Sequence, residues 1–513
     1  MNFSCLERFK IVTALSLVAI PLLTGCGGSQ TAPEKKEAEN KSASHSTLPE
    51  SNLVASTNVR FSVNADIMID TNTDTDANAN TNTNTNTNTN TNTNTNTNTD
   101  TDTNTDTNTN TNTNAATSEV ESPALQATQD AAKSDLAAAF PKDFKGLSQD
   151  KPAQGPSVAI DGGFMVPFAM TIPGTEISFE MVPVPGGMVM LGSPDDEEER
   201  EEIEGPQVQV SIPPMWVAKH EVTWKEFKHF MRLHDVFKRF EDKGIRKITD
   251  ENRMSAIAAP SNLYEPSFTY DAGEGPNEPA ATMSQFSAKQ YTKWLSLTTG
   301  TFFRIPTEAE WEYSCRAGST TAYYFGEDGQ TLTEYAWFED NADYARHDAG
   351  SLKPNAFGLY DMHGNVAEWV LDQRYEDGYA GLVETEDLTA ATAFKWPTEW
   401  FGRVAKGGSF ESTAAECRVA ARLVSEDDWR DSDPNIPRSP YWHTSYPATG
   451  VGMRLIMPLE PPKDTAGKEK YWEADIEEIR EIATRRAKAE GRGAFGLVDQ
   501  NLDQAIQDSE KDR

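Results

Sequence analysis

Short apolar runs separated by Pro and Gly begin at Ile177 and continue through most of the C-terminal part of the chain. Such a pattern is typical of β-strands joined by turns. Phe179–Val184 predicts a strand, Pro185–Gly187 a turn, and Met188–Ser193 a returning strand. Gln207–Ile212 alternates apolar and polar residues, which predicts one further strand.

Helices are predicted by capping residues and by apolar residues at helical spacing. Thr223–Glu226 and Thr307–Glu310 are capping boxes, in which the Thr and Glu side chains satisfy each other's backbone donors at a helix start. Ser284–Leu297 suits a longer helix that ends at Gly300. Residues 240–280 are predicted to form an irregular insertion. Together these elements predict an α+β domain, and no GxGxxG loop, Walker loop or nucleophile elbow accompanies them in the sequence.

Residues 1–25 have the pattern of a bacterial lipoprotein signal peptide. Arg8 and Lys10 precede the apolar run Ile11–Leu23, which is short for a membrane span. Small residues then lead to Cys26, as in a lipobox, so Cys26 is predicted to be lipidated and to begin the mature protein. The alternative is an ordinary signal peptide with an incidental cysteine. The lipoprotein interpretation places the chain in the bacterial cell envelope, outside the cytoplasm and anchored to a membrane through Cys26.

Residues 26–165 are predicted to be a disordered tether. Its centre, Thr71–Asn114, alternates Thr and Asn with occasional Asp, and offers little to bury against the entropy lost on ordering. An adhesive or aggregating Asn-rich tract is the alternative. The globular domain is predicted over 166–460, followed by a charged C-terminal helix and tail over 461–513. Apolar residues at helical spacing, Ile476 and Ile479 among them, would dock that helix on the domain or on a partner.

The net charge of −34 argues against nucleic acid as a partner, because phosphate binding needs the opposite sign. The acidic run Asp195–Glu204 is predicted to be a solvated loop. With Cys26 lipidated, the mature chain keeps Cys315 and Cys417, too few for a disulfide scaffold. These two cysteines either pair or are small buried hydrophobic residues.

The stretch Asn355–Trp369 combines a tight turn with two carboxylates. Gly364 and Asn365 tolerate positive φ, so the backbone can fold sharply there. Asp361 and Glu368 stand on either side of the turn, and carboxylates with turn carbonyls form the oxygen set that Ca²⁺ prefers. The alternative is a polar loop with one buried tryptophan.

Several stretches, taken in order, carry a family pattern. They are Pro185–Gly187 with Leu191–Ser193, Lys219–Thr223, Arg304–Tyr313, Asn355–Trp369, Arg403–Phe410, Arg418–Arg422 and Val451–Arg454. Over about residues 175–460 the chain resembles the formylglycine-generating enzymes, or sulfatase-modifying factors. The resemblance implies a compact variant of the C-type-lectin fold with little regular secondary structure. It also implies bound Ca²⁺, with side-chain ligands Asp361 and Glu368 and carbonyl ligands Gly364 and Val366.

The same resemblance implies a chemistry whose residues are incomplete here. The enzymes of the family oxidise a sulfatase cysteine to formylglycine with O₂ and Cu(I), and two thiolates suit that soft ion. Ser409 keeps the serine of the family's Gly-Gly-Ser turn. Counted forward from Gly407, Ser412 stands at the first thiolate position and Cys417 at the second; counted back from Arg422, Cys417 falls on a position that is not a ligand, so at most one thiol remains. The segment is also shorter than in the enzymes, and Ala367 stands where they have an active-site tryptophan. A Cu(I) site is therefore not expected.

The sequence thus predicts the family scaffold and leaves the question of activity open. It favours a non-catalytic binding or scaffolding module for a protein or peptide ligand in the envelope. The alternatives are a formylglycine-generating oxidoreductase, or a divergent oxidase, that uses Cys417 and Ser409 in the same pocket. A sugar-binding lectin rests on fold analogy alone.

Overall fold

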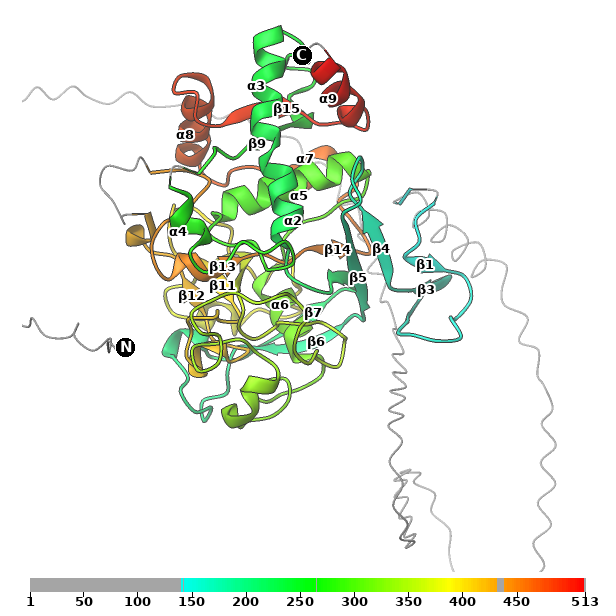
Figure 1. Cartoon of the computed structure of the whole chain (residues 1–513). Coiled ribbons are helices and arrows are strands. Elements are labelled where there is room, and N and C mark those ends of the chain that lie inside the picture. Colours follow the sequence, from blue (N-terminus) through cyan, green and yellow to red (C-terminus); the bar gives the residue numbers. More distant parts are fainter. Residues whose placement is uncertain (1–139, 142, 264, 431–437, 512–513) are drawn as a thin grey trace, which may run out of the picture. The chain divides into compact units, whose positions relative to one another are not determined.

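The computed structural model describes residues 140–141, 143–263, 265–430 and 438–511. Cys26, the signal peptide and the Thr/Asn tract lie outside these ranges, so what the sequence predicts for them remains a prediction. Within the described ranges no helix is long and apolar enough to cross a membrane. Short helices and strands mix throughout, in agreement with the α+β prediction (Figure 1).

An antiparallel sheet in the order β14-β8-β5-β4 packs against the main core. β5 and β6 are the two strands predicted around the Pro185–Gly187 turn, but they do not pair with each other, because β4 and β8 occupy both edges of β5. β6 pairs with β7 instead, with Val189 opposite Val210. The bounds of these strands are β4 Phe168–Thr171, β5 Ser178–Val184, β6 Gly187–Leu191, β7 Val208–Ile212, β8 Met215–Ala218 and β14 Ile456–Pro458.

A second sheet, in the order β12-β11-β10-β13, contains the strand that follows the predicted Ca²⁺ loop. Every residue of β10 is buried, including Glu368 and Asp372. A buried carboxylate is stable only with partners inside the protein, so the charges on this strand require an internal network. The bounds are β10 Ala367–Gln373, β11 Arg403–Lys406, β12 Leu423–Val424 and β13 Val451–Gly452.

The helices begin and end where their local residues predict. α2 (Trp224–Met231) and α6 (Glu308–Arg316) both start at the predicted capping boxes. α5 (Gln285–Thr299) ends at Gly300, whose φ of 73° closes the helix as its sequence predicts. The insertion predicted to be irregular contains regular elements, since α3 (Leu233–Lys243) reaches into it. It also contains β9 Ala256–Ala259 and α4 Pro266–Tyr270.

Ordered structure begins earlier than the predicted domain boundary at residue 166. Residues within the predicted tether form a sheet in the order β1-β3-β2, which corrects that boundary. Aromatic packing explains the order: Phe144 stacks on Phe140 and contacts the edge of the buried Trp216. The apolar residues before residue 166 are too few to give a periodic pattern in the sequence, although the contacts between their rings are specific. The bounds are β1 Leu147–Ser148, β2 Val158–Ile160 and β3 Gly163–Met165.

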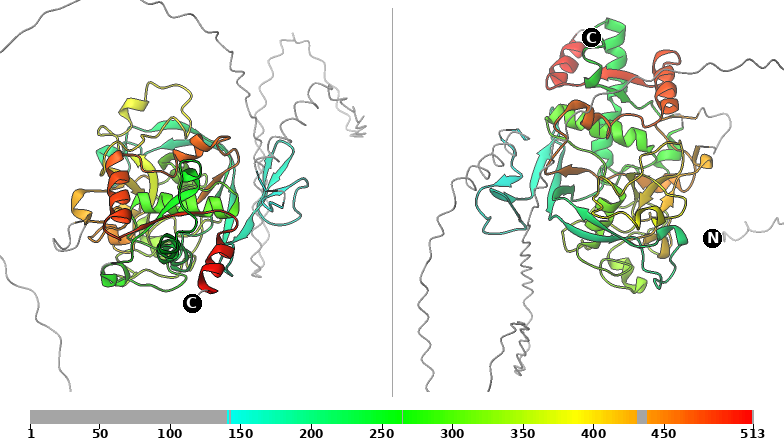
Figure 2. Two further views of the ribbon diagram at one scale, coloured as in Figure 1. Left: turned by 90° about the horizontal axis from the view of Figure 1, so that it is seen from above. Right: turned by 180° about the vertical axis from the view of Figure 1, so that it is seen from behind.

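The C-terminal segment is built into the domain. β15 (Ala494–Leu497) pairs with β9 and lies beside α3, α8 and α9 in Figure 1 and in the right view of Figure 2. Asp475 reaches two cations that are buried in the core, 2.6 Å from Lys289 Nζ and 2.6 Å from Arg403 Nη1. The predicted helix is α8, and it buries Ile479. The bounds are α7 Thr465–Glu469, α8 Glu477–Lys488 and α9 Leu502–Lys511.

Candidate functional site

The turn before β10 has the backbone that its sequence predicts. Asn365 and Gly364 have φ of 58° and 72°, and Asp361 also has a positive φ of 53°. A side chain at Gly364 would bring its Cβ within 2.2 Å of the Trp337 carbonyl oxygen, so glycine is required there. The turn therefore holds Asp361 and Glu368 inside the protein, where neither side chain reaches solvent.

Asp361 faces Glu221, a residue to which the sequence assigned no role. Asp361 Oδ2 accepts a hydrogen bond from the Gly350 amide at 2.6 Å. Asp361 Oδ1 and both carboxylate oxygens of Glu221 are buried and accept no hydrogen bond from the described residues. Burial, and then the charge of Asp361, raise the pKa of Glu221 well above its usual value. Two facing carboxyl groups in this state need either a shared proton or a cation.

Glu368 has partners of its own. Arg454 Nη2 lies 2.7 Å from Glu368 Oε1, and Trp311 Nε1 donates to Glu368 Oε2 at 2.7 Å. Arg454 also lies 4.0 Å from Glu221, so it joins the two carboxylates. The ion pair joins two stretches of the family pattern, Asn355–Trp369 and Val451–Arg454. It also means that Glu368 is already neutralised without a metal ion.

The charges of this cluster provide a test of whether Ca²⁺ fits. Glu221, Asp361 and Glu368, if all ionised, face the single guanidinium of Arg454 and leave a formal charge of −2. A divalent cation would balance that charge, and three carboxylate oxygens without a hydrogen bond are available to it. Among the described residues, no group of three or more His, Cys, Asp or Glu side chains could hold a metal ion. A cation here would therefore need backbone carbonyl oxygens as well.

Cys417 lies at the end of a short 3-10 helix, in an apolar environment. Its thiol is buried with Tyr323, Phe338 and other apolar side chains, and burial raises its pKa far above the usual value. His363 lies beside it, with Nδ1 2.7 Å from the Cys417 carbonyl oxygen. His363 Nε2 accepts a hydrogen bond from the Tyr324 amide, so Nδ1 carries the proton and donates to that carbonyl. The imidazole thus holds the backbone of Cys417, while burial of the thiol keeps it protonated.

The second cysteine of the domain lies in a different apolar cluster. Cys315 is free, as is Cys417, which excludes the disulfide that the sequence left open. The Cys315 thiol donates weakly to the Met362 carbonyl oxygen at 3.5 Å. A two-coordinate Cu(I) site needs two ionised thiols that face each other. Two protonated thiols in separate clusters do not meet that requirement, so the residues here do not fit copper.

Ser409 and Ser412 lie in one turn. The Ser409 amide donates to Ser412 Oγ at 3.0 Å, and the two hydroxyl oxygens are 3.5 Å apart. Ser409 is buried, because Gly450 packs against it so closely that an added Cβ would lie 2.6 Å from Ser409 Oγ. The two hydroxyl groups therefore complete a turn. Among the residues that the structure describes, no histidine forms a hydrogen bond with either hydroxyl, the arrangement that would activate a serine nucleophile.

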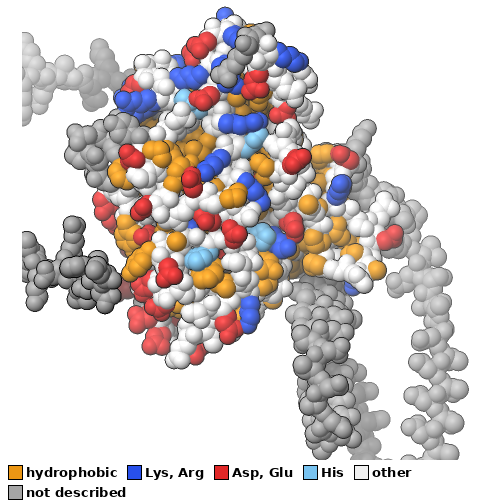
Figure 3. All heavy atoms as spheres, in the orientation of Figure 1, with side chains coloured by type: hydrophobic (Ala, Val, Ile, Leu, Met, Phe, Trp, Pro, Cys, Tyr) orange, Lys and Arg blue, Asp and Glu red, His pale blue; other side chains and the backbone are white. Residues whose placement is uncertain are grey.

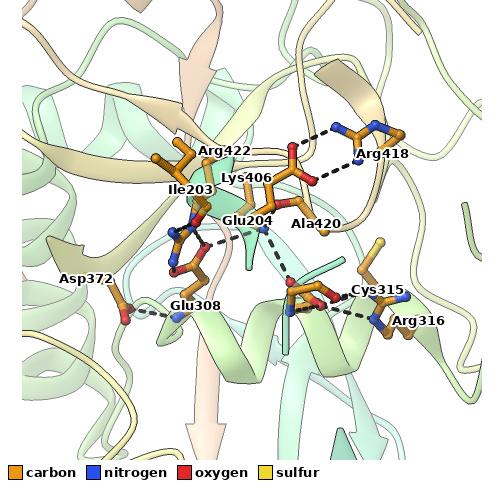
Figure 4. Close-up of polar contacts among 12 residues, drawn as sticks. Ile203, Glu204, Glu308, Cys315, Arg316, Asp372, Lys406, Arg418, Ala420 and Arg422 are labelled. Carbon is orange, nitrogen blue, oxygen red and sulfur yellow. Dashed lines mark hydrogen bonds and ion pairs between the residues drawn. The ribbon is translucent and has the colours of Figure 1, made fainter. Parts of the chain in front are cut away.

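A buried ionic network holds the segment that follows Cys417 against α6. Arg422 binds both carboxylate oxygens of Glu308 at 2.6 Å, and Lys406 lies 3.4 Å from both Glu308 and Glu312 (Figure 4). Arg316 closes the network on the other side, 2.9 Å from Glu312. These cations and carboxylates are nearly inaccessible to solvent, so their attraction is little screened. The network thus joins the glutamates of the stretch 304–313 to an arginine of the stretch 418–422.

Most of the acidic run 195–204 is exposed, as predicted for a solvated loop, but Glu197 and Glu204 turn inward and contribute to this network. Arg418 binds both oxygens of Glu204, at 2.6 and 2.8 Å, and also contacts Glu197. Glu204 is only 1% exposed. Charge pattern alone cannot find such a role, because the partners are more than two hundred residues apart in sequence.

Comparisons with known proteins show what this chain is similar to. The family model described as the sulfatase-modifying factor enzyme 1-like domain matches residues 173–433. A formylglycine-generating enzyme of Thermomonospora curvata is 30% identical over 286 residues, which are 49% of this chain and 90% of that protein. The inactive C-alpha-formylglycine-generating enzyme 2 of Mus musculus is 29% identical and covers 37% of this chain and 67% of its own. Among solved structures, PvdO from Pseudomonas aeruginosa is 27% identical with a TM-score of 0.39, covering 54% of this chain and 94% of its own.

Proposed function

Because the chain belongs to the sulfatase-modifying factor family, we propose that it is a member without the copper site. It acts as a binding or scaffolding module that a lipid on Cys26 holds at the cell envelope. The family includes active and inactive formylglycine-generating enzymes, so membership does not decide between catalysis and binding.

The observation that carries this proposal is the environment of Cys417. Its thiol is surrounded by apolar side chains, burial holds it in the protonated form, and Ser412 stands at the other thiolate position. A reactive or metal-bound cysteine needs the opposite setting, with nearby positive charge and solvent access. Cys417 therefore serves packing.

We further propose that the domain binds Ca²⁺ at Asp361 with the help of Glu221. The unpartnered oxygens of these two residues support the site, as does the formal charge of −2 that they share with Glu368 and Arg454. The carbonyl groups of Gly364 and Val366 are the further ligands that the family resemblance implies. Glu368 forms an ion pair with Arg454, so Glu368 acts on the site only through its negative charge.

The alternative function is formylglycine generation or a related oxidation. It is supported by the relative from Thermomonospora curvata and by the buried Ser409 next to the Cys417 segment. The two functions differ in one measurement: mass spectrometry of a peptide with the sulfatase motif CxPxR, after incubation with the copper-loaded protein and O₂. We expect no formylglycine. A formylglycine product that is lost in Cys417→Ala would establish the enzyme and refute the binding module.

A further inference from the structure

A cavity of about 350 Å³ shares no lining residue with the network around Arg422 or with the Asp361 cluster, so it belongs to none of the sites above. Residues from α3, α4 and α8 line it together with the segment that leads into β13. Its volume lies in the range of small-molecule sites. The residues on which the argument depends are Phe268, Arg430, Tyr441, Trp442, His443 and Arg486.

Arg430 is the unusual residue of this cavity. Its guanidinium stacks on Trp400 at 4.1 Å, and the residue is 8% exposed. No ion pair or hydrogen bond joins its side chain to any residue that the structure describes, and its Nε is buried without a partner. Arg422 and Arg454, by contrast, each bind a carboxylate. An unpaired buried guanidinium is costly, so a partner for Arg430 is missing from the described protein.

The surroundings of Arg430 add positive charge. Arg438, Arg486 and Arg492 also line the cavity, whereas its single acidic lining residue is Glu265. Glu265 is engaged at the start of α4, where it accepts a hydrogen bond from Ser267 Oγ at 2.9 Å. Asp427 and Glu490 each pair with one of the arginines, Arg438 and Arg486 respectively. Burial, and then the charge of Arg438, lower the pKa of Arg430 to about 10, as expected for a cation without a counterion.

The sign of this cavity differs from that of the whole chain, whose net charge is −34. In the space-filling view, Lys and Arg side chains are spread over the upper part of the protein, where α3 and α8 lie, whereas Asp and Glu gather at the lower end (Figure 3). The cavity also has unpartnered polar atoms, since His443 Nδ1 and Tyr441 Oη are buried without hydrogen bonds. Phe268 and Trp442 add an apolar wall beside them.

We propose that this cavity is a binding site for a small organic oxyanion, whose carboxylate or phosphate group is bound by Arg430 and whose apolar part packs against Phe268 and Trp442. The planar guanidinium offers two parallel donors, which match the two oxygens of such a group. Trp400 holds the guanidinium in place before the ligand arrives. The proposal is independent of whether Cys417 takes part in oxidation.

The test uses the full-length protein and three ligands of similar shape: benzoate, phenyl phosphate and the neutral benzamide. Calorimetry and thermal unfolding should show binding of at least one of the two anions, weaker at high salt, and no binding of benzamide. Arg430→Met should weaken anion binding roughly tenfold or more, because charge-assisted hydrogen bonds are lost. Arg485→Met is the matched control, since Arg485 lies on α8 outside the cavity and is 60% exposed.

Several outcomes would overturn the proposal. They are benzamide binding as well as the anions, binding of neither anion, or unchanged anion affinity in Arg430→Met. If Arg430→Met does not fold, Arg430→Lys replaces it, because lysine keeps the charge and loses the two-point geometry. Unchanged anion affinity in Arg430→Lys would also contradict the proposal. Segment 431–437, outside the described residues, contains Asp431 and Asp433. If the protein binds the anions only after both aspartates are changed to Asn, the partner of Arg430 is an aspartate of the chain itself. That result would refute the site.

Discussion

Arg422 and Glu308 form a two-point ion pair inside the protein, with Nε–Oε1 and Nη2–Oε2 distances of 2.6 Å. Glu308 is the first residue of α6, and Arg422 ends the segment that follows Cys417. The pair therefore fixes the position of Cys417 relative to the helix that carries Cys315. Both side chains are almost completely shielded from solvent, so loss of either partner would leave the other charge buried and uncompensated.

Removing one partner of this pair should destabilise the protein strongly. In Glu308→Gln, Arg422 and Lys406 lose a carboxylate while they remain buried, which should lower the free energy of unfolding by about 3–5 kcal/mol. Urea denaturation measures the change. Glu477→Gln is the control, because Glu477 pairs with Arg480 on the surface, and such pairs contribute about 1 kcal/mol or less. Equal effects of the two substitutions would contradict the network.

Glu308 should also make the stability depend on acid pH. Burial alone would raise its pKa, but Arg422 and then Lys406 lower it from 4.5 to about 2. A carboxyl group whose pKa is lower in the folded state stabilises the protein above the unfolded value, and this contribution is lost as the pH falls from about 4.5 to about 2. Acid titration of the folded fraction should therefore be less steep in Glu308→Gln than in the wild type. An identical slope would show that other groups control acid unfolding.

Calcium should stabilise the domain, and more so at higher pH. The raised pKa of Glu221 means that a proton competes with the cation, and this competition weakens as the pH rises. At a concentration one hundred times the Kd, the gain is roughly 2.7 kcal/mol. Thermal unfolding with Ca²⁺ and with a chelator, at pH 6 and pH 8, measures it.

Two variants locate the calcium effect. Asp361→Asn and Glu221→Gln should both lose the response to Ca²⁺, whereas Glu274→Gln, an exposed carboxylate paired with Lys228, should keep it. A full response in Glu221→Gln would remove that residue from the site. No response in the wild type would refute the calcium proposal and leave a shared proton as the explanation for the pair.

The C-terminal segment should be required for stability, because Asp475 neutralises Lys289 and Arg403 in the core. Asp475→Asn leaves two buried cations with a weaker acceptor and should lower the unfolding free energy by about 3 kcal/mol or more. Asp508→Asn on α9 is the control, since Asp508 pairs with Lys511 in solvent. Comparable midpoints of chemical denaturation for these two variants would show that the segment is only peripheral.

The proposed anchor can be tested by fractionation of cells. Cys26→Ser should block lipidation, so the protein should leave the membrane fraction or remain unprocessed and migrate more slowly. Labelling with a radioactive or alkyne-bearing fatty acid should mark the wild type and not the variant. Wild-type behaviour of the variant in both assays would exclude lipidation at Cys26.

Local sequence determined the start and end of several elements. The capping boxes at Thr223 and Thr307, the Gly300 end of α5 and the positive φ of Gly364 were all predictable, because each depends on residues within one turn of one another. The family pattern likewise indicated the α+β fold.

Tertiary structure decided the pairing and the charges. The sequence predicted β6 as a strand that returns from β5, whereas β5 pairs with β4 and β8. It also predicted the acidic run 195–204 as solvated, but Glu204 at the end of that run is buried against Arg418. Glu221 belongs to the family stretch Lys219–Thr223, but no role could be assigned to it from the sequence. Its partners Asp361 and Arg454 lie far along the chain, and only the fold brings them together. A carboxylate has the same sequence signature in solvent and in the core, because its energy depends on burial and on neighbours that the fold supplies.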